Sequence, residues 1–496
     1  MKQTTAILVF LALCGAAAAQ VDDNAFERQR REARARFEQM RNQERGRYND
    51  AKKKAEADYA AFRKKANADY AAALQKAWQH MGVEPAEPKP AEPKPPAPRK
   101  PSPDRLPSSI PLPQEESVPT PIKLPPPPLP PIPDPDPEVP TLRLTFYGSA
   151  CTLHADSEKL RFKLASADEK AVASAWEHLA GKDCDALLHD CLVAREDLCL
   201  SDWAYLSLLG QVSRQLLGGG NESTLLQVFL FTQSGYRARL ARCNGRLVPL
   251  VPFAHNFAGY SYIVLDGLKH YIVTDNHPTS VEVCAAAFPR EQTADIYVVR
   301  LPRLAKRPGQ TRTLAAQRFG TMKISVATDL NLVAYLNDHP VTDAWDRYAL
   351  TGLSEQAKAS LYPVLRSQVE GKSKAKAAAM LLDFVQTAFS YATDQDQFGY
   401  ERPLFADESF HYPKNDCEDR SIVYSILVRD LLGLDVVLVH YPGHLATAVA
   451  FPGEVDGDYF TVDGRRFTVC DPTYIGAGIG ESMPQFQNTK AHLYKL

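Results

Sequence analysis

Three residues in the last part of the chain, Cys417, His444 and Asp471, have side chains that could act together in nucleophilic catalysis. A thiolate is the reactive form of cysteine, an imidazole can hold its proton, and a carboxylate can orient the imidazole. They stand in the order Cys, His, Asp along the chain. This combination predicts a nucleophilic thiol that a base activates and a carboxylate supports.

The sequence around each residue predicts the element that carries it. Cys417 opens an apolar helix that ends near Gly433, after a polar turn. His444 begins a strand, and Asp471 ends a later strand just before a proline. The unpaired N–H groups and the positive dipole end of a helix start stabilise a thiolate, and the Cys417 backbone N–H could hold an oxyanion. A helix, a strand and the next strand are therefore expected to bring the three side chains together.

Two acidic residues beside the cysteine oppose its activation. Glu418 and Asp419 follow Cys417 directly, and nearby negative charge raises the pKa of a thiol. A reactive Cys417 therefore needs a cationic partner, and His444 can be that partner.

Structural roles remain open for single residues in this region. A lone cysteine at a helix start is more often structural than catalytic, and a disulfide between Cys417 and Cys470 would abolish activity. His440 lies inside an apolar run and is expected to be packed. Cys470 neighbours Asp471 on a strand, so it is expected to face the opposite side and join the core.

Three strings around these residues resemble known motifs: DCEDRS (416–421), YPGHLATAV (441–449) and CDPTY (470–474). They are similar to the motifs of the transglutaminase-like superfamily, in its bacterial cysteine-peptidase branch. The segment 376–403 also resembles the helical lead-in of that branch. The resemblance covers about residues 354–480 well.

The resemblance implies a papain-like fold in which Cys417 is the nucleophile, His444 the base and Asp471 the residue that orients it. Activities in the family include peptide and amide hydrolysis, deamidation and protein crosslinking, and some members have lost catalysis. It implies no metal and no nucleotide or other cofactor. Family members also use a second oxyanion donor upstream of the cysteine, for which the candidates here are Tyr391, Tyr400 and Tyr412.

The order of elements predicts an α+β fold, and the papain-like, transglutaminase-like core that the resemblance implies is interpreted as present twice. Residues 141–310 and 311–496 each predict early strands, then helices, then a final run of strands. Short sequence similarities between the two parts align Glu222, His255 and Asp275 of the first with Cys417, His444 and Asp471 of the second, in that order, although chance could produce them. The first copy then lacks the nucleophile and is interpreted as a degenerate domain, and the second as the catalytic domain.

The N-terminus predicts export. Residues 1–19 have a basic Lys2, an apolar stretch and a small-residue cleavage site after Ala19, as in a signal peptide. Lipidation at Cys14 and retention as an anchor stay open. The expected location is the periplasm, the cell surface or the extracellular space.

Residues 20–82 predict one long helix with an eleven-residue repeat. The repeat places aromatic side chains at Phe26, Phe37, Tyr48, Tyr59 and Tyr70. Eleven residues make three helical turns, so these side chains share one face and could join copies of the chain in a coiled coil. A single solvated helix is the alternative. Its excess of basic residues leaves open a weak attraction to a cell-envelope surface.

Residues 83–140 hold 24 of the 38 prolines of the chain. Each proline lacks an N–H and has a fixed φ, so the segment favours extended polyproline II structure. It is predicted to be a stiff spacer, with docking of a partner as the alternative.

Composition restricts the partners. The net charge of -2 gives no electrostatic signature for nucleic acid. Most of the nine cysteines lie in the middle of the chain, where the spacing of Cys184, Cys191 and Cys199 does not match paired zinc ligands. A protein or peptide substrate is the expected partner. The alternative to an enzyme is an envelope scaffold or binding protein that uses the same fold without turnover.

Overall fold

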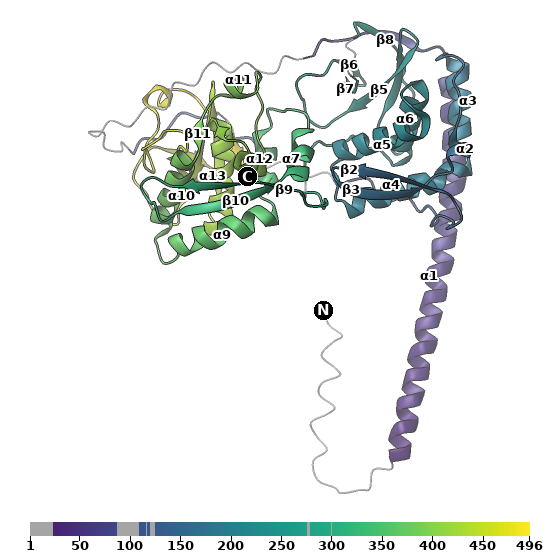
Figure 1. The fold of residues 1–496 in the computed structure, drawn as a ribbon, viewed down its shortest axis with the longest axis horizontal. Helices are drawn as coiled ribbons and strands as arrows, with labels where there is room; N and C mark the ends of the chain where they lie inside the picture. The colour runs from purple at the N-terminus through teal and green to yellow at the C-terminus, as the bar shows by residue number, and fades with distance from the viewer. Residues whose placement is uncertain (1–22, 87–108, 116, 120–124, 275–277, 299) are drawn as a thin grey trace. The chain divides into compact units, whose positions relative to one another are not determined.

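The structure is a computed structural model that describes residues 23–86, 109–115, 117–119, 125–274, 278–298 and 300–496 (Figure 1). The predicted signal peptide lies outside the described residues. The chain divides into two units, residues 1–62 and residues 63–496. Helices and antiparallel sheets are mixed, as an α+β fold requires. Within these ranges, no helix has both the length and the apolar character needed to cross a bilayer.

Helix α1 (Asp23–Leu74) is shorter than predicted. The indole Nε1 of Trp78 donates to the carbonyl oxygen of Leu74 (3.1 Å), where the helix ends. Residues Gln79–Gly82 then form strand β1, because they pair with β8 (Ser280–Cys284) in a sheet that overrides their helix propensity. Two aromatic residues of the repeat, Phe37 and Tyr48, are 59% and 69% exposed.

The first half of the larger unit packs helices against an antiparallel sheet of six strands, in the order β1-β8-β4-β5-β7-β6. A hairpin of β2 (Thr141–Phe146) and β3 (Ser149–His154) precedes the helices. The helices are α2 (Ser157–Leu160), α3 (Glu169–Leu179), η1 (Lys182–Cys184), α4 (Asp185–Asp197), α5 (Asp202–Leu217) and α6 (Asn221–Gln233). The remaining strands are β4 (Arg239–Cys243), β5 (Arg246–Pro252), β6 (Tyr262–Leu265) and β7 (Leu268–Ile272).

The second half has the same plan, with a sheet of five strands in the order β15-β16-β14-β13-β17. It begins with β9 (Pro308–Ala315) and β10 (Lys323–Asp329). The helices are α7 (Leu330–Asn337), α8 (Trp345–Thr351), α9 (Glu355–Val369), α10 (Lys374–Ala388), α11 (Asp394–Gln397), α12 (Ala406–His411), α13 (Cys417–Leu432) and η2 (Pro484–Phe486). The strands are β11 (Ser390–Tyr391), β12 (Lys414–Asn415), β13 (Val436–Tyr441), β14 (His444–Val449), β15 (Tyr459–Val462), β16 (Arg465–Cys470) and β17 (His492–Lys495).

The two large sheets share one topology. The strands that follow α6 are β4 to β8, and those that follow α13 are β13 to β17. When each set is numbered from one to five in chain order, both sheets have the strand order 3-4-2-1-5. In the first sheet, β1 is added beside the fifth strand. Every one of these pairs is antiparallel. A glycine of positive φ follows each helix (Gly235 and Gly433), and another turns each first hairpin (Gly245 and Gly443). The spacing between the two glycines is the same in both halves, so the halves align residue by residue here.

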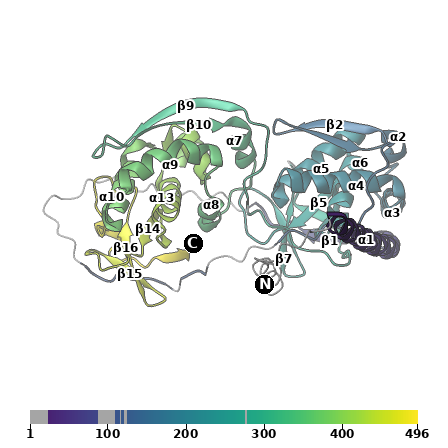
Figure 2. The same ribbon diagram turned by 90° about the horizontal axis from the view of Figure 1, so that it is seen from below.

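Helix α13 is the centre of the second half (Figure 2). Its apolar residues, such as Ile422 and Leu427, are fully buried. Its polar first turn is buried as well, from Cys417 to Ser421. A buried polar turn must find hydrogen-bond partners inside the protein, which restricts how the helix can sit on the sheet.

The proline-rich segment differs from the free spacer predicted. Residues 109–115 and 117–119, here called the strap, lie along the sheet of the second half. The N–H of Leu112 donates to the Tyr459 carbonyl (2.8 Å), and that of Val118 to the Leu493 carbonyl (2.7 Å). Leu112 is 6% exposed and belongs to the core around the sheet. The non-proline residues of the strap keep their N–H groups, so they can pair with an edge strand despite the prolines around them.

The strap therefore contributes to the stability of the second half. We expect Leu112→Ala to lower the free energy of unfolding by about 2–3 kcal/mol, because it leaves a cavity in a packed core. Leu129→Ala is the matched control: Leu129 is 52% exposed, so its truncation should change stability by less than about 0.5 kcal/mol. Urea unfolding followed by circular dichroism measures both. Equal, small effects would show that the strap is not part of the core.

Candidate active site

Cys417 is the first residue of α13 and is 1% exposed. One turn later, the hydroxyl of Ser421 donates to the carbonyl oxygen of Leu445 (2.9 Å). Leu445 follows His444 at the start of β14. This bond fixes the first turn of the helix, which begins with Cys417, against the start of the strand that begins with His444.

His444 and Asp471 form a buried pair. The Nε2 atom of His444 lies 2.8 Å from Oδ2 of Asp471, and the two residues are 1% and 2% exposed. The other carboxylate oxygen, Oδ1, accepts from the backbone N–H groups of Thr473 (2.9 Å) and Tyr474 (3.1 Å). Asp471 is thus held in place and can fix one tautomer of His444, with the proton on Nε2 and Nδ1 left to take a proton from a thiol.

Aromatic packing fixes the plane of the imidazole. The ring of Phe486 stacks on His444 with a centroid distance of 5.1 Å and an interplanar angle of 5°. Tyr441 in turn stacks on Phe486 at 4.6 Å. An imidazole held between a carboxylate and an aromatic ring has few ways to turn, which preorganises it for proton transfer.

Glu418 contacts the sulfur directly. The thiol of Cys417 donates to Oε2 of Glu418 over 3.1 Å. Burial raises the pKa of Glu418 well above its ordinary value, and the charges of Asp416 and Cys417 raise it further. A protonated Glu418 carries no negative charge. The opposition to thiolate formation that the sequence predicted for this residue is therefore weakened by its burial.

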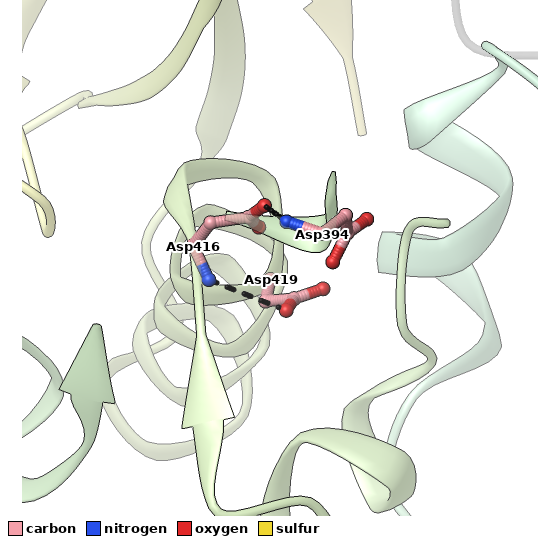
Figure 3. Close-up of side chains that lie close together, drawn as sticks. All are labelled: Asp394, Asp416 and Asp419. Carbon is pink, nitrogen blue, oxygen red and sulfur yellow. Dashed lines mark hydrogen bonds between the residues drawn. The ribbon is translucent and has the colours of Figure 1, made fainter. Parts of the chain in front are cut away.

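Acidic residues form a compact group behind the cysteine. Carboxylate oxygens of Asp394, Asp416 and Asp419 lie within 4.8 Å of one another (Figure 3). The Asp394 N–H donates to Asp416 (3.2 Å), and the Asp416 N–H to Asp419 (3.4 Å). A second group joins Asp394 with Glu401 and Glu418. Several carboxylates this close cannot all be ionised unless a positive charge compensates them.

Protonation or a cation can relieve this repulsion. Burial, followed by the charges of Asp416 and Asp419, raises the pKa of Asp394, and burial raises that of Asp419. Alternatively, carboxylate oxygens are the ligands that Ca²⁺ and Mg²⁺ prefer. The sequence analysis predicted no metal. The arrangement of the three aspartates fits a hard divalent cation by the chemistry of its donors, and those residues would be the ones to hold it.

The guanidinium of Arg420 is one of the buried cations of this region. It donates to the carbonyl oxygens of Gln386 (3.3 Å) and Phe389 (3.0 Å). It lies 5.4 Å from the ring centre of Tyr391. Arg420 thus links the helix of Cys417 to the end of α10 and to β11, and its charge partly offsets the acidic residues beside it.

The tyrosines proposed as oxyanion donors lie in different places. Tyr391 pairs with Asn415, two residues before Cys417, and its buried hydroxyl has no hydrogen-bond partner in the described structure. Burial, and then the charge of Cys417, raise the pKa of Tyr391, so its hydroxyl keeps the proton it would donate. Tyr412 packs against Phe398, and Tyr400 is 37% exposed.

His440 is packed and Cys470 lies in the core, as their positions in the sequence predict. The ring of His440 packs on Trp345 at 4.3 Å, and burial lowers the pKa of His440 to about 4. Cys470 is fully buried, and its thiol donates to the Thr468 carbonyl. Every described cysteine is free, so no disulfide joins Cys417 to Cys470.

The alignment of the two halves changes the predicted counterparts of the triad. His444 pairs with Tyr441 in the second half, and Arg246 pairs with Cys243 at the same place in the first. Arg246 therefore corresponds to His444, not the predicted His255.

His255 lies beyond β5, where it hydrogen-bonds Arg347. The same alignment places Gly219 opposite Cys417, where Glu222 was predicted. The register of β5 with β7, compared with that of β14 with β16, places Thr274 opposite Asp471. The predicted Asp275 lies outside the described residues.

Sequence reasoning missed residues that hold the site together. Gln386 donates through Nε2 to the carbonyl oxygens of Asp471 (2.9 Å), Tyr474 (3.0 Å) and Ala477 (3.1 Å). The sequence feature that could have indicated Gln386 is its position as a polar residue inside the apolar run LLDFVQTAF (381–389). Phe486 gave no such signal, because a phenylalanine in a C-terminal loop has no distinctive spacing.

Comparison of the chain with family models, with curated proteins and with solved structures finds no match. The function is therefore inferred from the fold and from the geometry of this site.

The acidic group predicts an unusual dependence of stability on pH. The unfolded-state pKa of an aspartate is about 3.9, and the folded-state pKa of Asp394 is raised. A raised pKa stabilises the fold below the unfolded value, and this stabilisation is lost as the pH rises through the folded value. We expect Asp394→Asn to be more stable than wild type at pH 8 by about 1 kcal/mol or more, and no more stable at pH 4.5.

Thermal unfolding in EDTA at the two pH values measures this effect. Asp396→Asn on the same short helix is the matched control, because Asp396 is exposed. Addition of Ca²⁺ decides between protonation and a cation. A midpoint that rises with Ca²⁺ in wild type but not in Asp394→Asn would assign the group to a cation and contradict the protonated state.

Proposed function

We propose that the second half is a cysteine hydrolase or acyltransferase that acts on peptide or amide bonds. The observation that carries this proposal is the buried His444–Asp471 pair, fixed by two backbone N–H groups, beside the helix turn that begins with Cys417. Catalysis through a thiolate needs a carboxylate that orients the histidine in this way, whereas a structural histidine does not need one.

In the proposed reaction, Nδ1 of His444 takes the thiol proton and the sulfur of Cys417 attacks the carbonyl carbon. Asp471 stabilises the imidazolium that forms. The Cys417 N–H, at the helix start, and the hydroxyl of Tyr391 are the proposed oxyanion donors. His444 then protonates the leaving amine, and water, activated by the same imidazole, hydrolyses the thioester. Hydrolysis is favoured over transfer to an amine because water is always present. No cofactor takes part in these steps.

The topology supports the proposed relationship to the transglutaminase-like superfamily. A helix that starts with the nucleophile and packs on an antiparallel sheet is what a papain-like core needs. The repeated strand order supports a duplication, with a first half that has lost the triad. The signal-like N-terminus supports export to the periplasm or the cell surface, where a protein or peptide would be the substrate.

An envelope scaffold or binding protein is the second candidate. The observation that favours it is burial: Cys417, His444 and Asp471 are each at most 2% exposed. A substrate can reach the sulfur only when a covering segment moves. In an enzyme the segment would also open transiently in the free protein and so admit a small reagent, whereas in a scaffold it would not open.

Alkylation of the thiol separates the two candidates. We expect iodoacetamide at pH 6 to modify Cys417 in the wild-type protein, and His444→Ala to slow that reaction about tenfold or more, because the imidazolium no longer stabilises the thiolate. His492→Ala is the control, since His492 lies on the same sheet and is half exposed. Mass spectrometry identifies the modified residue, and buried Cys470 serves as an internal reference. Equal rates in all three proteins would exclude the catalytic pair.

We further propose that α1 joins copies of the chain. Its exposed Phe37, Met40 and Tyr48 form an apolar seam that a second helix could cover. Replacing Phe37 and Tyr48 together by alanine should shift the protein from dimer or higher oligomer to monomer, as measured by sedimentation velocity. Gln43→Ala on the same helix should leave the distribution unchanged. A wild-type protein that is already monomeric at high concentration would rule this association out.

A further inference from the structure

The first half contains a cavity at the place that corresponds to the proposed active site. The cavity has a volume of about 800 Å³. Its wall includes Gly219 before α6, Arg246 at the start of β5, and Thr274 after β7. These three residues are the counterparts of Cys417, His444 and Asp471 in the alignment of the two halves. The cavity is therefore the first-half equivalent of the catalytic site, without its nucleophile, base or carboxylate.

Asn221 fixes the geometry of this cavity. Its Oδ1 accepts from the N–H of Leu247 (2.8 Å), and its Nδ2 donates to the carbonyl oxygen of Gly245 (2.9 Å). The two bonds hold the start of α6 against the hairpin that carries Arg246. Ser421 holds α13 against the start of β14 in the same way. Arg246 thus lies beside a helix N-terminus, where an anion is favoured by the unpaired N–H groups.

The wall of the cavity is positively charged. Among the described residues of the wall, Arg214 and Arg246 are the charged ones, and none is an aspartate or glutamate. Neither guanidinium has a hydrogen bond or ion pair with another described residue. The nearby carboxylate of Glu222 does not belong to the wall, and it accepts from the N–H of Leu164 (3.0 Å). Two uncompensated arginines in one concave site favour an anionic ligand, and their planar groups suit carboxylates.

A smaller cavity of about 350 Å³ adjoins this one and shares Arg214 and Trp203 with it. Its one acidic residue, Asp338, already accepts a hydrogen bond from the hydroxyl of Tyr147. Trp203 and Tyr260 give the larger cavity an aromatic side. A volume in this range accommodates a few residues of a peptide, and the aromatic side can pack on the apolar part of a ligand.

We propose that this cavity binds an acidic peptide segment without cleaving it. Arg214 and Arg246 hold its carboxylates, and the start of α6 adds N–H donors. The choice of a peptide rests on the proposed function of the second half, whereas the choice of an anion rests on the arginines alone. With Gly219 at the position of the cysteine, the site has no nucleophile, so binding is not followed by acyl transfer.

The test is calorimetric titration of the full chain with acetyl-hexaglutamate amide at low ionic strength. We expect binding by the wild-type protein, and about tenfold weaker binding for Arg214→Gln and for Arg246→Gln, since each loses a charged hydrogen bond to a carboxylate. Arg161→Gln is the matched control, an exposed arginine of the same half outside the cavity. It should bind as the wild type does. Circular dichroism confirms that each variant is folded.

The outcomes are distinct from those of the alkylation experiment. Cys417→Ala should bind the hexaglutamate peptide with unchanged affinity, so loss of the catalytic pair and loss of this site can be told apart. No binding by the wild type, or equal binding by all three arginine variants, would overturn the proposal. Tighter binding of pyrophosphate than of the peptide would also overturn it, because the site would then be one for phosphate.

Discussion

The burial of a polar helix turn is the constraint on which the second half depends. The residues from Cys417 to Ser421 are removed from water, and each needs a partner that the surrounding chain must supply. Ser421 bonds β14, Arg420 bonds the end of α10, and Asp419 accepts from the N–H of Leu404 at 2.8 Å. These bonds allow one position of the helix on the sheet. That position holds the first turn of the helix, which begins with Cys417, against the start of the strand that carries His444.

The same burial determines the electrostatics of the site. Burial raises the pKa values of Asp394, Glu418 and Asp419 and so favours their uncharged forms, which changes what they do to the thiol. Glu418 is the clearest case, because it contacts the sulfur and its burial raises its pKa. Buried acidic groups destabilise the fold above the pH at which they ionise. The region around Cys417 is thus expected to be less stable than the apolar core beneath it, which suits a site that must open to admit a substrate.

The elements that carry Cys417, His444 and Asp471 could be predicted from the sequence better than the rest of the scaffold. Cys417, His444 and Asp471 stood at predictable element boundaries, because a helix start and two strand ends are marked by turns, glycine and proline. The structure places the three on those elements, and it shows directly the contact between His444 and Asp471.

The counterparts in the first half could not be found by short similarities, because register depends on strand pairing. Arg246 and His255 lie nine residues apart in the sequence, but only one of them begins β5. The contacts of the strap with the sheet could not be predicted for a similar reason. A proline-rich composition shows that a segment will be extended, but not whether a distant edge strand will bind it.

The strap has a consequence for the order in which the molecule can be made. The side chain of Gln114 donates to the carbonyl of Thr461, a partner 347 residues away in the chain (2.6 Å). Val118 bonds β17, which follows the strap by more than 300 residues. A contact of such long range forms late, because both segments must first be synthesised and the loop between them closed. The whole first half is synthesised between the strap and its partners, so the second half can reach its final edge only after β17 has been synthesised.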